Sequence, residues 1–417
     1  MALFGRSRPI DSGRSESFID AEINKINGLC KCYRERLKFF RAAVFLHADA
    51  AGQRPRTGRE LTNEHFSMSS TAFPTVALGR TDMNITRIGL GAWALGGNGW
   101  AVAWGPQDDA ESVKAIRHAV DRGINWIDTA AVYGLGHSEE IVRQALAQMP
   151  PSERPYVFTK GGLTWSPEQP QAMPRRTGAP SSIRRELEAS LRRLGVERID
   201  LYQMHWPAGD GTPLEAYWQE LLDLKQAGKV RAVGLSNHNL AQLRAAQYLG
   251  HVDTLQPPFS AIQRGAASDL IPWCAATGTG VIVYSPMQSG LLTGRFSAER
   301  ARALPPDDWR ARHADFRSPD LERNLALADA FKPIAERHGA TVAATAAAWT
   351  LAWPGVTGAI VGARSASQVD GVIGAAELEL DADDMQAIAD AIELTGAGNG
   401  PLRPPDETGS LPANLFA

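Results

Sequence analysis

Short apolar runs alternate with amphipathic segments from about Thr75 towards the end of the chain. Eight runs have the length and composition of buried strands, and apolar residues recur at helical spacing in the segments between them. The runs are Ile88–Trp93, Asn125–Asp128, Tyr156–Lys160, Ile199–Met204, Ala232–Leu235, Thr254–Gln256, Val281–Tyr284 and Ala359–Val361. Two further segments, Thr75–Leu78 and Asn84–Thr86, flank a Gly-Arg-Thr-Asp turn sequence and predict a β-hairpin before the first run.

Several of the intervening segments have clear helix boundaries. Acidic or hydroxyl residues precede Ala110–Asp121 and Ile183–Leu194, and a proline precedes Leu214–Gln226. A glycine follows each of the three closely, which is the expected asymmetry of helix ends. The chain therefore consists of repeated strand–helix units.

Eight such units predict an α/β protein, specifically a (β/α)8 TIM barrel whose closed sheet has no free edge. A doubly wound open sheet is the alternative. That fold places Gly-x-Gly-x-x-Gly after its first strand, whereas the glycines here are Gly89, Gly91 and Gly96, with the wrong third spacing. The glycine spacing favours the barrel.

Composition narrows the possible partners and location. The 417 residues are 44% hydrophobic and 21% charged, which excludes a disordered or fibrous protein. A formal charge of −3 gives no general attraction for nucleic acid or an anionic membrane surface, and no apolar run is long enough to span a bilayer. Three cysteines cannot form a disulfide framework or a zinc site, so we expect a cytoplasmic protein without a metal.

The first 67 residues differ from the rest. They contain twelve basic and eight acidic residues and lack a sustained period. We interpret residues 1–67 as a poorly structured N-terminal extension and residues 68–417 as the barrel domain. One hypothesis is that Met68 is the native start, and the other is that the extension is a disordered tail. Mass spectrometry of the native N-terminus distinguishes them.

Polar residues follow three successive predicted strands, where a barrel places its active site. They are Asp128, Tyr133, Lys160 and His205. Each alone has an ordinary explanation, as a helix cap, a packed aromatic, a surface cation or a core histidine. Their convergence on one end of the barrel favours a catalytic function.

These four groups have the chemistry of a carbonyl reductase. The Tyr133 phenol has an ordinary pKa near ~10, so it donates a proton readily only if a cation such as Lys160 stabilises the phenolate. Asp128 can orient Lys160, and a neutral His205 can donate a hydrogen bond to a carbonyl oxygen. A bound cofactor must supply the hydride, because no side chain can.

Tyr156 and Lys160 also match the Tyr-x-x-x-Lys spacing of short-chain dehydrogenases. That spacing brings the two groups together only on a helix, and Val157 and Phe158 favour a strand. On a strand the two residues are roughly 13 Å apart. We therefore interpret Tyr156 as structural.

The sequence resembles the aldo-keto reductases from about Leu78 to beyond the last strand. The matching motifs are Ile88-Gly89-Leu90-Gly91, Asp128 with Tyr133-Gly134, Thr159-Lys160, Ile199 to His205, Gly234 to Asn237, Gln256-Pro257 and Gly290 to Arg295. Within the family, Trp126 to Ala130, His205 to Pro207 and Pro404 to Glu407 most resemble the bacterial general-stress type. The resemblance implies that Asp128, Tyr133, Lys160 and His205 form the catalytic tetrad, with Tyr133 as proton donor.

The same resemblance implies NADPH as cofactor, with NADH possible. Ser236, Asn237 and Gln256 match the residues that bind the nicotinamide carboxamide, Tyr284 matches the stacking aromatic, and Arg364 is the candidate for the 2′-phosphate. The full set of implied cofactor contacts is Gly91, Trp93, Asp128, Ser236, Asn237, Gln256, Tyr284, Ser285, Met287, Gly290, Leu291, Arg295, Gly362, Arg364 and Gln368. The alternative for Arg364 is a solvated side chain at a helix start.

The chain departs from the family pattern near the adenine site. Gly371 and Val372 stand where a Glu-Asn pair is common, which leaves the strength of the NADPH preference open. Trp93 and Trp206 are expected to form flat walls of a substrate pocket, or else to pack in the core. Neither the physiological carbonyl substrate nor the oligomeric state follows from the sequence.

Two functions agree with these observations. The first is an NADPH-dependent reductase that converts aldehydes or ketones to alcohols with Tyr133 as general acid. The alternative is a cofactor-bound regulatory subunit that resembles the redox-sensing β-subunits of channels. Turnover of reduced cofactor in the presence of aldehydes separates the two.

Overall fold

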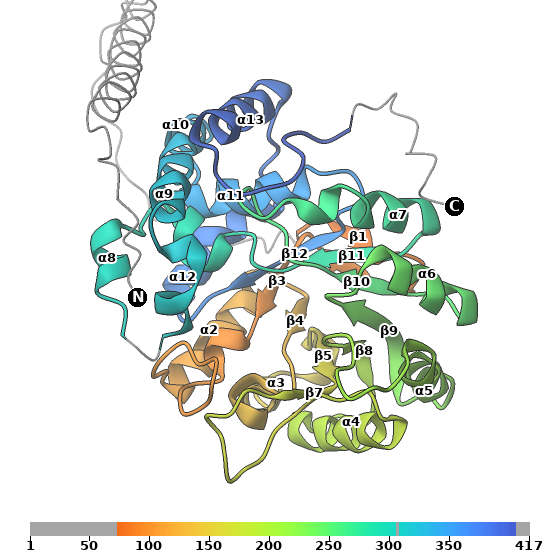
Figure 1. Ribbon diagram of the computed structural model, residues 1–417. Coiled ribbons are helices and arrows are strands. Elements are labelled where there is room, and N and C mark those ends of the chain that lie inside the picture. Colours follow the sequence, from red (N-terminus) through yellow and green to blue (C-terminus); the bar gives the residue numbers. More distant parts are fainter. Residues whose placement is uncertain (1–72, 306–307, 406–417) are drawn as a thin grey trace, which may run out of the picture. The chain divides into compact units, whose positions relative to one another are not determined.

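A computed structural model describes residues 73–305 and 308–405. Eight parallel strands form a closed barrel, in chain order around the ring, so the open-sheet alternative is excluded (Figure 1). The strands are β3 (Ile88–Gly91), β4 (Trp126–Asp128), β5 (Tyr156–Gly161), β8 (Ile199–Met204), β9 (Val230–Ser236), β10 (Thr254–Gln256), β11 (Gly280–Val283) and β12 (Gly358–Gly362). Each overlaps one of the predicted runs, which confirms the (β/α)8 fold.

Helices surround the barrel (Figure 1). They are α2 (Asp109–Asp121), α3 (His137–Leu146), α4 (Pro180–Leu194), α5 (Leu214–Gln226), α6 (Leu240–Leu249), α7 (Leu270–Thr277), α8 (Ala298–Arg302), α9 (Asp320–Ala330), α10 (Lys332–Arg337), α11 (Val342–Leu351), α12 (Ala366–Ile373) and α13 (Ala382–Thr395). The three helices with clear sequence boundaries all form. Helix α2 begins at its Asp108 cap, whose side chain accepts a hydrogen bond from the Glu111 backbone N–H.

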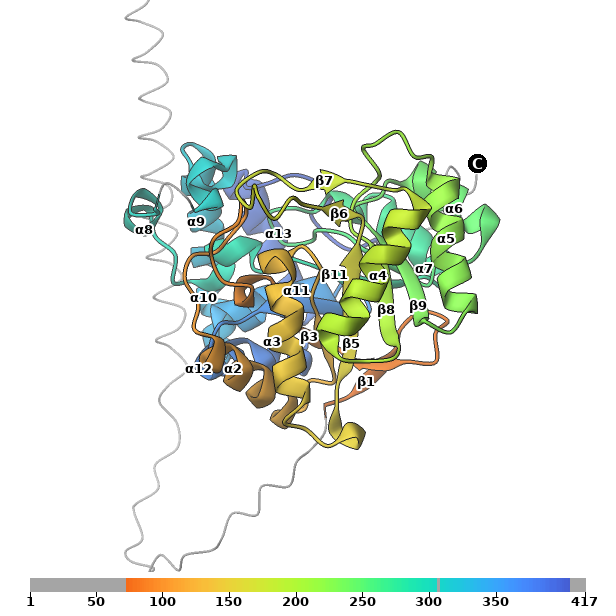
Figure 2. The same cartoon turned by 90° about the horizontal axis from the view of Figure 1, so that it is seen from below.

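A hairpin closes the N-terminal end of the barrel. Strands β1 (Thr75–Ala77) and β2 (Asn84–Thr86) pair antiparallel, as predicted. The side chains of Leu78, Met83 and Ile85 from this hairpin are fully buried against the lower interior of the barrel. A second hairpin, β6 (Leu163–Thr164) with β7 (Arg175–Arg176), lies at the opposite end (Figure 2). The barrel is therefore closed by apolar side chains at the end opposite the expected active site.

The barrel interior changes from apolar to polar towards the C-terminal ends of the strands. Trp126, Phe158 and Leu201 belong to an apolar layer inside the barrel. Because side chains alternate between the two faces of a strand, the residues two positions further along point the same way. Asp128 and Lys160 therefore face inward one layer closer to the C-terminal ends. The alternation therefore places the polar layer of Asp128 and Lys160 directly next to the apolar layer of the barrel interior.

Three further expectations concern the N-terminal extension, membrane-spanning helices and metal sites. The proposed N-terminal extension, residues 1–67, lies outside the described residues. No helix within residues 73–305 and 308–405 is long and apolar enough to cross a bilayer. Within the same ranges, no three His, Cys, Asp or Glu side chains are grouped so as to hold a metal ion.

Candidate active site

A buried ion pair lies at the centre of the site. The Lys160 Nζ of β5 donates to Asp128 Oδ1 at 2.5 Å and to the Thr129 backbone carbonyl at 2.9 Å. Only 1% of Lys160 and 3% of Asp128 is exposed, so neither charge has enough water to stabilise it alone. The pair and the Thr129 carbonyl together compensate for the lost hydration.

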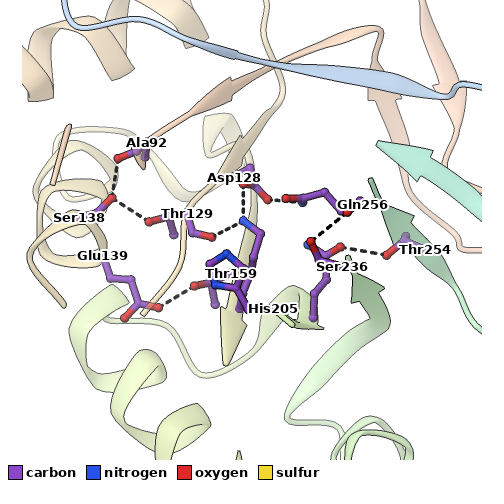
Figure 3. A network of polar contacts seen from close by, with 12 residues as sticks. Ala92, Asp128, Thr129, Ser138, Glu139, Thr159, His205, Ser236, Thr254 and Gln256 are labelled. Atoms are coloured by element: carbon purple, nitrogen blue, oxygen red, sulfur yellow. Dashed lines mark hydrogen bonds and ion pairs between the residues drawn. The ribbon is translucent and has the colours of Figure 1, made fainter. Parts of the chain in front are cut away.

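Further hydrogen bonds connect this pair to two other strands and tie β5 to a helix. Gln256 Nε2 of β10 donates to Asp128 Oδ2 at 2.9 Å, and Ser236 Oγ of β9 donates to the Gln256 backbone carbonyl at 2.9 Å (Figure 3). Behind β5, Thr159 Oγ1 donates to the buried Glu139 carboxylate of α3 at 2.7 Å. The polar layer is thus held from several sides.

Tyr133 reaches the same point from the loop after β4. The next residue, Gly134, has a φ of 61°, and a Cβ there would lie 2.1 Å from the Gly96 carbonyl oxygen. Only glycine allows this close turn, which directs the Tyr133 ring over the ion pair. Lys160 Nζ lies 5.2 Å from the centre of that ring, and His205 meets it edge to face at 5.6 Å. The four predicted catalytic residues are therefore brought together.

His205 is buried and neutral in this setting. Burial lowers its pKa well below 6.5, and the Lys160 cation lowers it further. Its Nδ1 has no hydrogen-bond partner among the described residues. A neutral imidazole with an unsatisfied ring nitrogen at the edge of a cavity is suited to contacting a polar ligand atom.

The ionisation of the other three groups is dominated by burial. Burial lowers the pKa of Lys160, which Asp128 opposes, and raises the pKa of Asp128, which Lys160 opposes. Burial also raises the pKa of Tyr133 well above 10, and the Asp128 carboxylate adds to this rise. The Lys160 cation is expected to stabilise the phenolate, but burial and Asp128 outweigh this effect, so Tyr133 is a protonated phenol in this site.

A cavity of about 600 Å³ opens above these residues, a size typical of small-molecule sites. Of the sequence-predicted residues, those that line it are Gly91, Trp93, Asp128, Tyr133, His205, Trp206, Ser236, Asn237, Gln256, Tyr284, Ser285, Met287, Gly290, Arg295, Gly362, Arg364 and Gln368. Lys160 lies beneath the lining. Leu291 is buried in the hydrophobic core and does not line the cavity, so its cofactor contact stays a prediction.

The amide groups near the ion pair hold one another in place. Asn237 has a φ of 63°, and its Nδ2 donates to the His205 carbonyl and to Ser236 Oγ, at 2.9 and 3.1 Å. Tyr284 Oη donates to Asn237 Oδ1 at 2.8 Å. Both Nδ2 hydrogens of Asn237 are thus used within the protein. Gln256 Oε1 accepts no hydrogen bond from the described residues and remains available for a ligand amide.

Four arginines line the other side of the cavity: Arg295, Arg300, Arg310 and Arg364. Arg364 is half-buried, and its guanidinium donates to Gln107 Oε1 at 2.6 Å and to the backbone carbonyls of Trp104 and Pro106. These contacts fix the Arg364 side chain against the loop before α2, and both its role at the 2′-phosphate and the alternative of a solvated side chain stay predictions. Arg300 and Arg310 could not be assigned to the site from the sequence, because the segment that carries them has neither a strand nor a long helical pattern.

Aromatic side chains form the upper wall. Trp93 stacks on Tyr133 with ring centres 6.0 Å apart and on Trp309 at 5.8 Å, and Trp104 packs edge-on against Trp93 at 5.1 Å. On the other side of the opening, the Arg176 guanidinium lies 4.3 Å above the Trp206 ring. Both predicted tryptophans thus line the cavity, and their contact with a substrate stays a prediction.

The comparison with known proteins agrees with this geometry. The model of the "Aldo/keto reductase family" matches residues 87–393. The chain belongs to the aldo/keto reductase family. It is 34% identical over 332 residues to an NADH-specific methylglyoxal reductase of Escherichia coli K12, covering 76% of this chain and 99% of that protein. It is 33% identical to aldo-keto reductase YhdN of Bacillus subtilis, covering 76% and 92%.

The solved structure of a glycerol dehydrogenase from Gluconobacter oxydans matches this aldo/keto reductase with a TM-score of 0.70. The two are 38% identical, and the match covers 82% of this chain and all of the other. Family membership makes the protein an NAD(P)H-dependent oxidoreductase that acts on small carbonyl compounds.

The residues present in this aldo/keto reductase fit a nicotinamide dinucleotide. The cavity extends from an aromatic ring and a free amide oxygen, Tyr284 and Gln256, to the four arginines. Amide and aromatic groups suit a nicotinamide, and guanidinium groups suit phosphates. Tyr133 and His205 line the same cavity, so a carbonyl substrate can lie within reach of both.

Proposed function

We propose that this aldo/keto reductase is an NADPH-dependent reductase of aldehydes and ketones, with Tyr133 as general acid. The observation that carries the proposal is the buried Asp128–Lys160 pair directly under the Tyr133 ring, with a neutral His205 beside it. The names of its relatives, a methylglyoxal reductase and a glycerol dehydrogenase, support small carbonyl or alcohol substrates for this chain.

In this mechanism the side chains orient the carbonyl and supply the proton. The nicotinamide, when bound, supplies a hydride to the carbonyl carbon. His205 donates its ring N–H to the carbonyl oxygen, which stabilises the negative charge that develops there. Tyr133 Oη then gives its proton to the same oxygen, and the alcohol forms. A phenol of raised pKa remains protonated before the reaction, and an alkoxide is basic enough to take its proton.

Lys160 stabilises the Tyr133 phenolate that remains after proton transfer. Its ammonium group lies 5.2 Å from the centre of the ring, and Asp128 and the Thr129 carbonyl fix its position. Asp128 therefore acts through Lys160 and does not need to touch the substrate. General acid catalysis of this kind contributes a factor of about 10²–10⁴ in rate.

The decisive experiment is turnover. Purified protein is mixed with NADPH or NADH, side by side, and with a panel of aldehydes and ketones, and cofactor oxidation is followed by absorbance. We expect oxidation with the wild type and at least a hundredfold loss with Tyr133→Phe, with cofactor binding retained in that variant. Tight cofactor binding by the wild type without any turnover would instead support a redox-sensing subunit.

The preference for NADPH rests on Arg364 and is tested separately. We predict that Arg364→Ala weakens NADPH binding by about tenfold and NADH binding much less, because a guanidinium binds the 2′-phosphate that only NADPH carries. Gln107→Ala is the matched control, since it removes one side-chain contact of Arg364 but keeps the guanidinium and its contacts with the Trp104 and Pro106 carbonyls. Fluorescence titration measures both affinities. Equal weakening of NADPH and NADH by Arg364→Ala would contradict a role in reading the phosphate.

A further inference from the structure

The lining of the cavity is strongly biased towards positive charge. Among the described residues, its acidic lining is Asp128 alone, and Lys160 already pairs with it. Its arginines are Arg176, Arg295, Arg300, Arg310 and Arg364. A concave site lined by one sign of charge concentrates ions of the opposite sign. The cavity thus favours anionic ligands over its whole length.

One of these arginines is separated from the other four. Arg295, Arg300 and Arg310 follow β11, and Arg364 follows β12. Arg176 belongs to β7, which lies in the connection between β5 and β8. In the order of strands around the barrel, β5 and β8 are opposite β11 and β12. Arg176 therefore enters the cavity from the side across from the arginines that suit the cofactor phosphates.

The local structure places Arg176, which remains exposed, in the lining of the cavity. In the β6–β7 hairpin, Leu163 pairs with Arg176, and Thr164 pairs with Arg175. Paired residues on neighbouring strands share a face. Leu163 and Arg176 line the cavity, whereas Thr164 and Arg175 do not. The alternation of this short hairpin thus presents one arginine to the cavity and its neighbour to the other face.

Arg176 also has unused binding capacity beside the catalytic residues. Its guanidinium lies 4.3 Å over the ring of Trp206, which directly follows His205. It forms no ion pair with any described residue, whereas Arg310 is paired with Asp308. Stacking on an aromatic ring orients a guanidinium but leaves its N–H groups free to donate hydrogen bonds. The remaining lining on this side is apolar: Trp100, Val102, Val132, Leu163, Met173 and Trp206.

We propose that Arg176 is a specificity-determining residue that binds a carboxylate on the carbonyl substrate, so that the preferred substrates are oxo acids with an apolar body between the carbonyl and the carboxylate. This inference rests on the proposed reductase function. The carbonyl group binds beside Tyr133, and the apolar side chains pack against the body of the substrate. The guanidinium N–H groups of Arg176 donate to the carboxylate oxygens. A single guanidinium matches a carboxylate better than a phosphate dianion, which normally takes several donors.

The test compares a negatively charged substrate with its neutral methyl ester, and the variants show how much of the difference depends on Arg176. The ratio of kcat/KM for 4-carboxybenzaldehyde to kcat/KM for its methyl ester is measured for the wild type, with the 3-carboxy isomer and its ester as a second pair. We expect a ratio above about five in the wild type and a ratio near one in Arg176→Met. Arg176→Lys should keep an intermediate ratio, because it keeps the charge but not the bidentate geometry. Arg175→Met is the matched control and should leave the wild-type ratio unchanged.

Three results would overturn the proposal: a wild-type ratio near one for both pairs, an unchanged ratio in Arg176→Met, or an equal fall in Arg175→Met, which would indicate only the general surface charge. These results differ from a failure of the reductase function. If neither the acids nor the esters are reduced with NADPH or NADH, the proposed function fails. If the esters are reduced without discrimination against them, only the role of Arg176 fails.

Discussion

Lys160 and Asp128 illustrate how two buried charges stabilise each other. Breaking a buried ion pair by removing one partner typically costs about 3–5 kcal/mol, because the other charge is left without compensation. Asp128 would then keep only the Gln256 amide as a partner. The same two residues therefore contribute both to stability and to the proposed chemistry, and a single substitution cannot separate the two contributions.

A double variant separates them. We predict that Lys160→Met lowers turnover by at least a hundredfold and also lowers the melting temperature, since it leaves the Asp128 carboxylate buried and unpaired. Asp128→Asn combined with Lys160→Met removes both charges and should recover most of the lost stability without recovering turnover. Thermal unfolding and steady-state kinetics measure the two effects. Normal turnover in either variant would exclude lysine from the mechanism.

At the scale of elements, the contact between β3 and β4 depends on a missing side chain. A Cβ at Gly89 would lie 2.2 Å from the ring atoms of Trp126, whose indole Nε1 donates to the Thr86 carbonyl. The indole is fully buried and packs against Phe158, so it cannot move aside without disturbing its neighbours. Gly89 thus allows the two strands to pair while a large ring fills the barrel interior.

We predict that Gly89→Ala destabilises the protein by about 3 kcal/mol, at the upper end of overpacking effects, because the new methyl group meets a rigid indole. Gly362→Ala on β12 is the matched control, since a Cβ there meets no atom within 4 Å. Its free energy of unfolding should change by less than about 1 kcal/mol. Chemical denaturation of both variants checks this. Similar losses of unfolding free energy in the two variants would indicate that strand propensity, and not contact with Trp126, determines the effect at Gly89.

The strands and the tetrad could be predicted because each has a local signal. Strand lengths follow apolar runs, and Asp128, Lys160 and His205 stand at or just after strand ends. The β6–β7 hairpin has two residues per strand, too few for any period to be visible. Arg176 therefore could not be assigned to the cavity from the sequence. Arg364 lines the cavity, and its role in cofactor binding stays a prediction. Its contacts with Trp104, Pro106 and Gln107, more than 250 residues away, depend on the closed barrel.

At the scale of the whole molecule, buried neutral histidines make stability depend on pH. Burial lowers the pKa of His238 from 6.5 to about 4. Its ring nitrogens contact Tyr217 Oη and the Ser236 carbonyl, both at 2.8 Å. Between these two pKa values the unfolded chain binds a proton that the folded chain does not bind. Stability therefore falls as pH decreases below 6.5, by up to about 3 kcal/mol from this residue at pH 4. His205 adds to the same effect.

We predict that His238→Gln reduces the decline in the free energy of unfolding between pH 6.5 and pH 4.5 by about 1 kcal/mol per pH unit. The substitution can lower stability at pH 7, so the slope and not the absolute value is the measured quantity. Urea denaturation at several pH values gives that slope. An identical slope in the wild type and the variant would place the acid sensitivity in other groups.

The β1–β2 hairpin, which closes the N-terminal end of the barrel, affects the order of events in a catalytic cycle. Leu78, Met83 and Ile85 fill the N-terminal end of the barrel and are fully buried, so among the described residues this end offers no route to the cavity. Two ligands that enter through the same opening cannot exchange independently. The ligand that binds deeper is expected to bind first and to dissociate last. The fold thus imposes an order on ligand binding and release. The slowest of these steps sets an upper limit on the turnover rate.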